Sequence, residues 1–251
     1  MKKLMVLLTL LLVPVFAVAA EDAIPLDHMT PDLHDKASLQ RGDKYFTNYC
    51  MGCHSAKYMR YQRVAKDLGI PNELYEKNLI FTGAKIGELM DNAMSPSQAT
   101  GWFGKAPPDL TLEGRLRGAD WIYSYLKGFY KDDSRPRGVN NVVFPKVAMP
   151  HVLVNLQGLC AEPPRLGAKP HVDPMSGDVR GEGGCSKWAQ KGSMTPQQYD
   201  QVAYDITNFL FYMGEPIKLQ RERLGTYVLI FIAIFFVFAY LLNREYWKDV
   251  H

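Results

Sequence analysis

Two cysteines and a histidine lie within five positions of one another in the stretch NYCMGCHSAK, residues 48–57. They are Cys50, Cys53 and His54, and they form a Cys-x-x-Cys-His pattern. Thiols at this spacing can ligate a metal ion, exchange a disulfide, or form thioether bonds to a haem. Because each of these chemistries requires different surroundings, the rest of the chain discriminates between them.

The first two chemistries require features that this sequence lacks. A structural zinc site takes four ligands, usually from two such pairs, and Cys160 and Cys185 are not spaced as a second pair. A thioredoxin-like motif belongs to a βαβ unit, whereas the residues before Cys50 predict a helix. Cys-x-x-Cys-His is the pattern of c-type haem attachment. We therefore predict one covalent haem c, bound through Cys50 and Cys53, with His54 as the proximal iron ligand.

The residues alone leave two candidates for the sixth iron ligand. A methionine opposite the histidine raises the reduction potential and suits electron transfer. Met51 lies inside the motif and cannot reach the opposite face, and Met213 lies on a predicted apolar helix face. Met149 lies in the proline-flanked loop FPKVAMPHVL, and His151 follows it two positions later. Both residues stay open as candidates at this point.

The first twenty residues have the order of a secretory signal peptide. Lys2 and Lys3 precede an apolar run that closes on small residues at Ala19 and Ala20. This small-residue exit disfavours the alternative, an N-terminal membrane anchor. We expect residues 1–20 to be removed on export.

A second apolar block lies near the C-terminus, where residues 224–242 are nineteen positions without a charge. At about 1.5 Å per residue this block reaches about 28 Å, close to the roughly 30 Å hydrocarbon core of a bilayer. It has no polar stripe, as a buried soluble helix of this length would have. We predict a transmembrane helix over residues 224–242.

The orientation follows from the signal peptide rather than from the flanking charges. Three basic residues precede the span and only Arg244 and Lys248 follow it, so the charge bias points weakly against an exported domain. Long domains translocate largely regardless of this bias. We expect residues 21–223 to form an exported haem domain in the periplasm and residues 243–251 to form a cytoplasmic tail.

The charge balance gives no indication of a nucleic-acid partner. The formal net charge is +3, and four of the basic residues lie in the two end segments. The expected exported part is therefore nearly neutral, whereas binding to a phosphate backbone depends on clustered basic residues.

Helices dominate the predicted secondary structure. Residues 37–49 read as an amphipathic helix that runs directly into the cysteine motif. A second helix is predicted over residues 195–214, with Thr195 as N-cap, Pro196 at the first position and Gln198 completing a capping box. Little of the chain reads as strand, and the remainder is rich in proline and glycine. The predicted class is all-α with long loops.

Cys160 and Cys185 bracket residues 161–184, which are rich in Pro and Gly and have few apolar side chains. In an exported protein two such thiols should oxidise to a disulfide. A loop of this length would stabilise the fold by about 3 kcal/mol in the chain-entropy model. The alternative is a pair of free or metal-binding thiols.

Several motifs occur in an order that resembles the cytochrome c1 family, in a proteobacterial form. They are CMGCHSAKYMRY, APPDLT with Arg115 and Arg117 shortly after it, NNVVFPKVAMP, the capped helix and the C-terminal span. The resemblance covers nearly all of the expected mature chain. It implies an all-α, cytochrome c-like haem domain with one C-terminal transmembrane helix.

The resemblance also implies roles for individual residues. Met149 matches the distal axial ligand of the family, and Arg117 matches an arginine that pairs with a haem propionate. Pro107 and Pro108 match residues that shape the wall of the haem pocket.

Members of this family are the haem subunit of ubiquinol–cytochrome c reductase. The resemblance implies that the chain takes an electron from a Rieske iron–sulfur protein and passes it to a cytochrome c acceptor, with no bond-making chemistry of its own. It further implies a contact with cytochrome b, a dimeric multi-subunit complex and a bacterial inner membrane location. A stand-alone anchored carrier and a haem-based ligand sensor are the alternatives.

Overall fold

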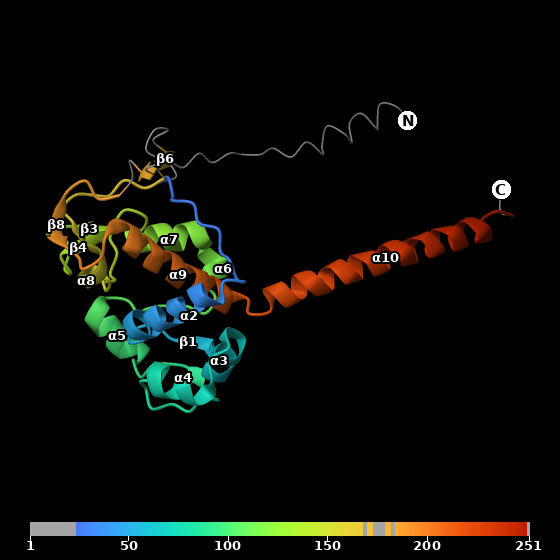
Figure 1. Ribbon diagram of the computed structural model, residues 1–251, viewed down its shortest axis with the longest axis horizontal. Helices are drawn as coiled ribbons and strands as arrows, with labels where there is room; N and C mark the ends of the chain where they lie inside the picture. The colour runs from blue at the N-terminus through green and yellow to red at the C-terminus, as the bar shows by residue number, and fades with distance from the viewer. Residues whose placement is uncertain (1–23, 168–169, 173–178, 182–183, 250–251) are drawn as a thin grey trace.

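The computed structural model describes residues 24–167, 170–172, 179–181 and 184–249. The predicted signal peptide, residues 1–20, lies outside them, as do part of the 161–184 loop and the end of the predicted tail. Figure 1 shows a helical body from which one long C-terminal helix extends.

The helix before the cysteine motif is present. It is α2 (Lys36–Tyr45), whose N-cap Asp35 accepts a hydrogen bond from the backbone N–H of Ser38. It continues into a single π-helical turn, η1 (Phe46–Cys50), which ends at the first motif cysteine. Such turns widen a helix locally and are frequent at functional sites. The predicted helix over residues 37–49 is therefore confirmed, with a change of helical type near its end.

The second predicted helix, α9 (Pro196–Gly214), begins at the expected capping box. It crosses α2 closely (Figure 1), and Gly42 makes the crossing possible. A Cβ atom at Gly42 would lie 2.1 Å from the carbonyl oxygen of Asp205, too close for any side chain. Beside this contact, Arg41 holds the Asp205 carboxylate through two hydrogen bonds of 2.6 and 2.9 Å. Because α2 packs on α9, the cysteine motif that follows α2 and η1 is held against the core.

The remaining helices of the body are shorter. They are α3 (Tyr61–Leu68), α4 (Asn72–Leu79), α5 (Pro96–Phe103), α6 (Glu113–Arg117), α7 (Ala119–Lys127) and α8 (Val154–Gln157). Helix α6 also packs backbone to backbone on α9, because a Cβ at Gly114 would lie 2.6 Å from the carbonyl oxygen of Leu210. Helices α6, α7 and α9 therefore form one wall of the interior (Figure 1).

The fold is mostly helical, as predicted, but the class all-α is too simple. A four-stranded sheet in the order β4-β3-β5-β8 lies at one side of the body. Its strands are β3 (Phe129–Lys131), β4 (Val139–Asn141), β5 (Gly158–Cys160) and β8 (Trp188–Lys191). Strand β3 pairs with β4 antiparallel and with β5 parallel, and β5 pairs with β8 antiparallel. Strands this short show no alternation of apolar and polar residues, so their sequence does not reveal them.

Two further pairs of strands lie outside this sheet. Strand β1 (Ala56–Arg60) pairs with β2 (Leu89–Met90) directly after the cysteine motif. Strand β6 (Pro170–Val172) pairs with β7 (Val179–Gly181) inside the segment expected to be plain loop. That segment begins and ends at a disulfide between Cys160 and Cys185, whose Cα atoms are 5.6 Å apart.

The long C-terminal helix is α10 (Lys218–Tyr246), and it contains the predicted span over residues 224–242. It is the one helix of the described part of the chain long and apolar enough to cross a membrane, with a mean hydropathy of 2.5 in its most apolar window. None of its residues is buried against the body. It begins four residues after α9 ends, so the anchor is joined directly to a core helix.

Candidate haem site

One cavity of about 290 Å³ lies between the cysteine motif, helices α6, α7 and α9, and the loop that carries Met149. Its walls are mostly apolar side chains, among them Leu110, Ile122, Val147 and Leu210. Every haem-binding residue predicted from the sequence lines this cavity: Cys50, Cys53, His54, Pro108, Arg117 and Met149. The tertiary structure therefore brings together residues from three distant parts of the chain.

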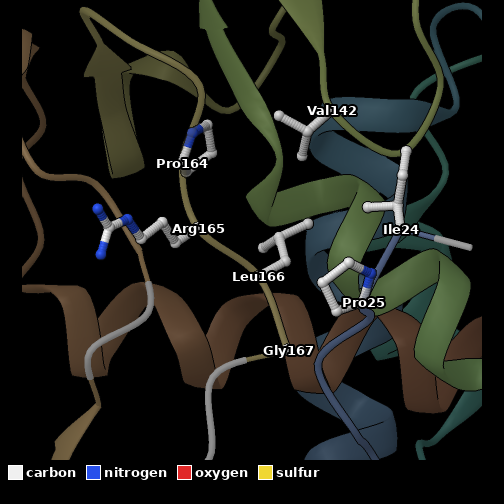
Figure 2. Close-up of a pocket in the computed structure, with 7 residues that line it drawn as sticks. All are labelled: Ile24, Pro25, Val142, Pro164, Arg165, Leu166 and Gly167. Carbon is white, nitrogen blue, oxygen red and sulfur yellow. The ribbon is translucent and has the colours of Figure 1, made fainter. Parts of the chain in front are cut away.

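A second cavity, of about 380 Å³, lies elsewhere, next to the first described residues. Figure 2 shows Pro164, Arg165, Leu166 and Gly167 along one segment, with Ile24, Pro25 and Val142 on the other side. Its one charged side chain, Arg165, is exposed and points away from the other labelled groups. Its described lining contains no cysteine, histidine or methionine, so it does not offer iron ligands.

The two motif thiols are unbridged and line the apolar cavity of about 290 Å³. The turn that presents them is closed by hydrogen bonds from the backbone N–H groups of Cys53 and His54 to the carbonyl oxygen of Cys50, at 3.0 and 2.9 Å. Burial, with a smaller contribution from the neighbouring Cys53, raises the pKa of the Cys50 thiol to about 12. Both thiols line one cavity and are unbridged, so both are available for thioether bonds to a haem.

The imidazole of His54 is oriented by the backbone of Pro108. Its Nδ1 lies 2.7 Å from the Pro108 carbonyl oxygen, which can only accept, so Nδ1 carries the proton and donates. Burial lowers the pKa of His54, which keeps the ring neutral. The Nε2 atom then has a free lone pair, and a second partner on the other nitrogen is the usual arrangement of a metal-binding histidine. Pro108 thus contributes an acceptor as well as the predicted wall.

The two candidates for the sixth ligand lie in different environments. Met149 lines the cavity, and the hydroxyl of Tyr125 lies 3.3 Å from its Sδ. His151 lies outside the cavity lining, because its Nε2 donates to the carbonyl oxygen of Gly158 at 3.1 Å. Its ring also stacks on Phe129 at 4.6 Å between centroids, and burial lowers its pKa to about 4. Of the two residues, only Met149 faces the site.

Two asparagines shape the loop of residues 142–150, which carries Met149. The side-chain oxygen of Asn141 accepts from the backbone N–H of Val143 at 2.9 Å. The side-chain oxygen of Asn140 accepts from the backbone N–H of Lys146 at 2.8 Å. The backbone of Lys146 is in the left-handed region, with φ 62°. Strained backbone of this kind persists where surrounding contacts hold it. The sequence analysis did not single out these asparagines, although they stand in the NNVVFPKVAMP motif.

Arg117 lies at the rim of the cavity, at the end of α6. Its Nε donates to the carboxylate of Glu113 at 3.3 Å, and its guanidinium lies 4.8 Å from the centroid of the Trp121 ring. Trp121 in turn stacks on Tyr125, with 5.0 Å between centroids and 9° between the planes. All four side chains line the cavity. The four-residue spacing of Trp121 and Tyr125 would have indicated a shared face of one helix, α7, but the sequence analysis named only Arg117.

The donor set fits a haem c. It combines two unbridged thiols, a neutral imidazole with one free nitrogen, a thioether from a distant loop, and a guanidinium at the rim. Cysteine thioethers, histidine and methionine form the binding set of electron-carrying c-type haems.

A family model described as the cytochrome C1 family matches residues 27–180 and 190–250. The chain belongs to the cytochrome c1 family. The sequence prediction of this family is confirmed, and with it the prediction of a covalently bound haem c, the cofactor of this family of electron carriers. With its apolar helix α10, the chain is a membrane-anchored member.

Three relatives are similar to this chain over 86–100% of its length. Cytochrome c1 of Allochromatium vinosum is 51% identical over 251 residues, covering all of both chains. A protein of Nitrosomonas europaea named ammonia monooxygenase gamma subunit is 42% identical over 245 residues, covering 98% of this chain and 97% of its own. Cytochrome b/c1 of Bradyrhizobium diazoefficiens is 24% identical over 265 residues, covering 86% of this chain and 34% of its own.

Proposed function

We propose that this chain is the haem c subunit of a membrane quinol–cytochrome c oxidoreductase. It accepts an electron from a Rieske iron–sulfur protein and passes it to a cytochrome c. The observation that carries the proposal is the one cavity on which the motif thiols, His54 and Met149 converge. Family membership supports the role in electron transfer. The identity of the electron donor and of the electron acceptor is our proposal.

In this proposal Cys50 and Cys53 would hold the haem as thioethers, and His54 and Met149 would ligate its iron. When bound, haem c supplies an iron that gains and loses one electron. The hydrogen bond to Pro108 fixes the His54 ring and its free nitrogen before the cofactor is bound. The apolar wall excludes water, which disfavours the more highly charged oxidised state and so raises the reduction potential.

The rim arginine has a separate role. Arg117 pairs with a haem propionate, because a guanidinium fork matches a carboxylate. Its present partner Glu113 lies on the same helix turn and also lines the cavity. We expect Arg117 to keep its position through Trp121 while its hydrogen bonds shift toward the propionate.

The membrane helix is the proposed contact with cytochrome b. None of the residues of α10 is buried by the rest of the described chain, so its side chains are free for lipid and for a neighbouring helix. The Bradyrhizobium relative is named cytochrome b/c1, and this chain matches about a third of it. That name supports a close association of the two components.

The proposed layout follows the sequence prediction. Residues 1–20 are a signal peptide, residues 21–223 a periplasmic haem domain, residues 224–242 the span and residues 243–251 a cytoplasmic tail. The disulfide between Cys160 and Cys185 supports an oxidising compartment for the haem domain. The cell location is then the bacterial inner membrane.

Purification in mild detergent tests the proposal. We expect the chain to co-elute with a di-haem b-type protein and an iron–sulfur subunit, and the pool to reduce cytochrome c with a quinol. Elution as a lone haem protein would instead favour a stand-alone anchored carrier. Rapid binding of carbon monoxide to the reduced protein would favour a ligand sensor, because a site with two axial protein ligands resists it.

A further inference from the structure

The hydroxyl of Tyr125 is directed at the sulfur of Met149. Tyr125 lies on α7 and lines the cavity, and its O–H donates to the Met149 Sδ at an O-to-S distance of 3.3 Å. An ordinary phenol has a pKa of about 10, so the proton needed for the bond is present at neutral pH. No other hydrogen bond of this hydroxyl occurs within the described part of the chain.

The Tyr125 ring is held independently of Met149. It stacks on Trp121, and it meets Phe129 edge-on with 5.3 Å between centroids and 71° between planes. Its backbone carbonyl accepts from the side chain of Asn141 at 2.8 Å, at the base of the loop that carries Met149. The donor is therefore placed by packing on one side and tied to the methionine loop on the other.

We propose that Tyr125 is a positioning residue that orients Met149 toward the iron position and raises the reduction potential of the site. The inference rests on the proposed function, in which Met149 is the distal ligand. A thioether sulfur has two lone pairs, so one can accept from the phenol while the other faces the cavity. The hydrogen bond selects which lone pair faces inward. It also withdraws electron density from the sulfur, which makes Met149 a weaker donor and favours the reduced state.

Tyr123 offers a matched control on the same helix. Its hydroxyl donates to Asp200 at 2.6 Å, and it does not line the cavity. Replacement of either tyrosine by phenylalanine removes one hydroxyl and keeps the ring. Only Tyr125→Phe removes a hydrogen bond to the proposed ligand.

The test is a redox titration of the haem-loaded, full-length protein in detergent. In Tyr125→Phe we expect the equilibrium constant for reduction to fall about threefold to tenfold, as loss of one hydrogen bond implies. A tenfold fall is about 59 mV for one electron. The sulfur-to-iron charge-transfer band of the oxidised protein should shift in Tyr125→Phe and stay unchanged in Tyr123→Phe. An unchanged potential and band in Tyr125→Phe would overturn the proposal.

Two further measurements separate the possible failures. If Met149→Leu keeps the charge-transfer band, the proposed ligand set fails, whatever Tyr125→Phe does. If the Tyr125→Phe variant does not accumulate with haem, the hydrogen bond can still be tested in the wild-type protein. Its reduced form should give a nuclear Overhauser contact between the Tyr125 hydroxyl proton and the Met149 methyl group, and absence of that contact would contradict the hydrogen bond.

Discussion

His54 and Pro108 are 54 positions apart in the chain, and the Nδ1 of the histidine lies 2.7 Å from the carbonyl oxygen of the proline. A backbone acceptor cannot be protonated or change rotamer, so it fixes both the tautomer and the ring orientation. Pro107 and Pro108 both line the cavity, and their restricted φ angles stiffen this acceptor. The thioether of Met149 comes to the same cavity on a loop that is also fixed by backbone-directed hydrogen bonds.

Met149→Leu should remove the distal ligand with little effect on the fold. The two side chains have similar volumes, so we expect less than about 1.5 kcal/mol of destabilisation. The oxidised spectrum should lose its sulfur-to-iron charge-transfer band, and the reduced protein should bind carbon monoxide. Met213→Leu is the control, because Met213 is buried in the core of α9 and does not line the cavity. Retention of the band by Met149→Leu, or its loss in Met213→Leu, would contradict the assignment.

Gly42→Ala should destabilise the body by forcing α2 away from α9. Its Cβ would lie 2.1 Å from a backbone carbonyl oxygen, which cannot move aside as a side-chain tip can. Overpacking of this kind costs about 1–3 kcal/mol, to be measured as the change in thermal unfolding midpoint. Gly101→Ala in α5 is the matched control, since no atom lies within 4 Å of its Cβ position. Equal thermal unfolding midpoints for Gly42→Ala and Gly101→Ala would contradict the close contact between α2 and α9.

Asp43→Asn should change how stability depends on pH. Burial is the main cause that raises the pKa of Asp43 from 3.8 to about 7, although the hydroxyl of Tyr75 donates to it at 3.1 Å. Between these two values the folded state keeps a proton that the unfolded state has lost, so stability falls as the pH rises toward 7. Above pH 7 the Asp43 carboxylate is ionised in both states, and its burial then lowers the free energy of unfolding by on the order of 4 kcal/mol, which is the free energy that corresponds to this pKa difference.

Asparagine at position 43 carries no charge, so the variant should gain stability over the wild type at pH 8 and not at pH 4. Thermal unfolding of both proteins across this range measures the difference. The same substitution at Asp133, whose side chain is 78% exposed, should leave the profile unchanged. A constant difference between Asp43→Asn and wild type at all pH values would refute the expected titration.

Replacement of both Cys160 and Cys185 by alanine should affect stability but not the haem site. Loss of the bridge lowers the free energy of unfolding by about 3 kcal/mol in the chain-entropy model. Neither residue lines the cavity, so the charge-transfer band and the reduction potential should match the wild type. Denaturant unfolding under oxidising conditions gives the first quantity, with chemically reduced wild type as the comparison. A large change in potential would mean that the bridged loop reaches the haem site.

The elements that the sequence predicted well depend on residues close together in the chain. The capping box at Thr195 and Gln198 needs only four consecutive positions, and it begins α9 where expected. The Cys-x-x-Cys-His pattern likewise places three groups within one turn. The apolar block over residues 224–242 needs only length and composition to form a helix that can cross a membrane.

Other features depend on contacts between distant segments, which local patterns do not encode. Each strand of the β4-β3-β5-β8 sheet is three or four residues long and forms because a partner strand is present. Tyr125 reads as one more aromatic residue of a helix until the fold brings Met149 within 3.3 Å of it.

The neighbouring residues Met149 and His151 show the division most clearly. Both can ligate iron, and they lie two positions apart, so the sequence determined that this loop could supply a ligand. Only the tertiary structure decided which residue faces the cavity, because packing on Phe129 and a hydrogen bond to Gly158 hold His151 away from it. Functional groups that lie within one turn of the chain can be recognised from the sequence alone. The choice between two residues that could both ligate iron depends on tertiary contacts, because these hold one of the two side chains away from the cavity.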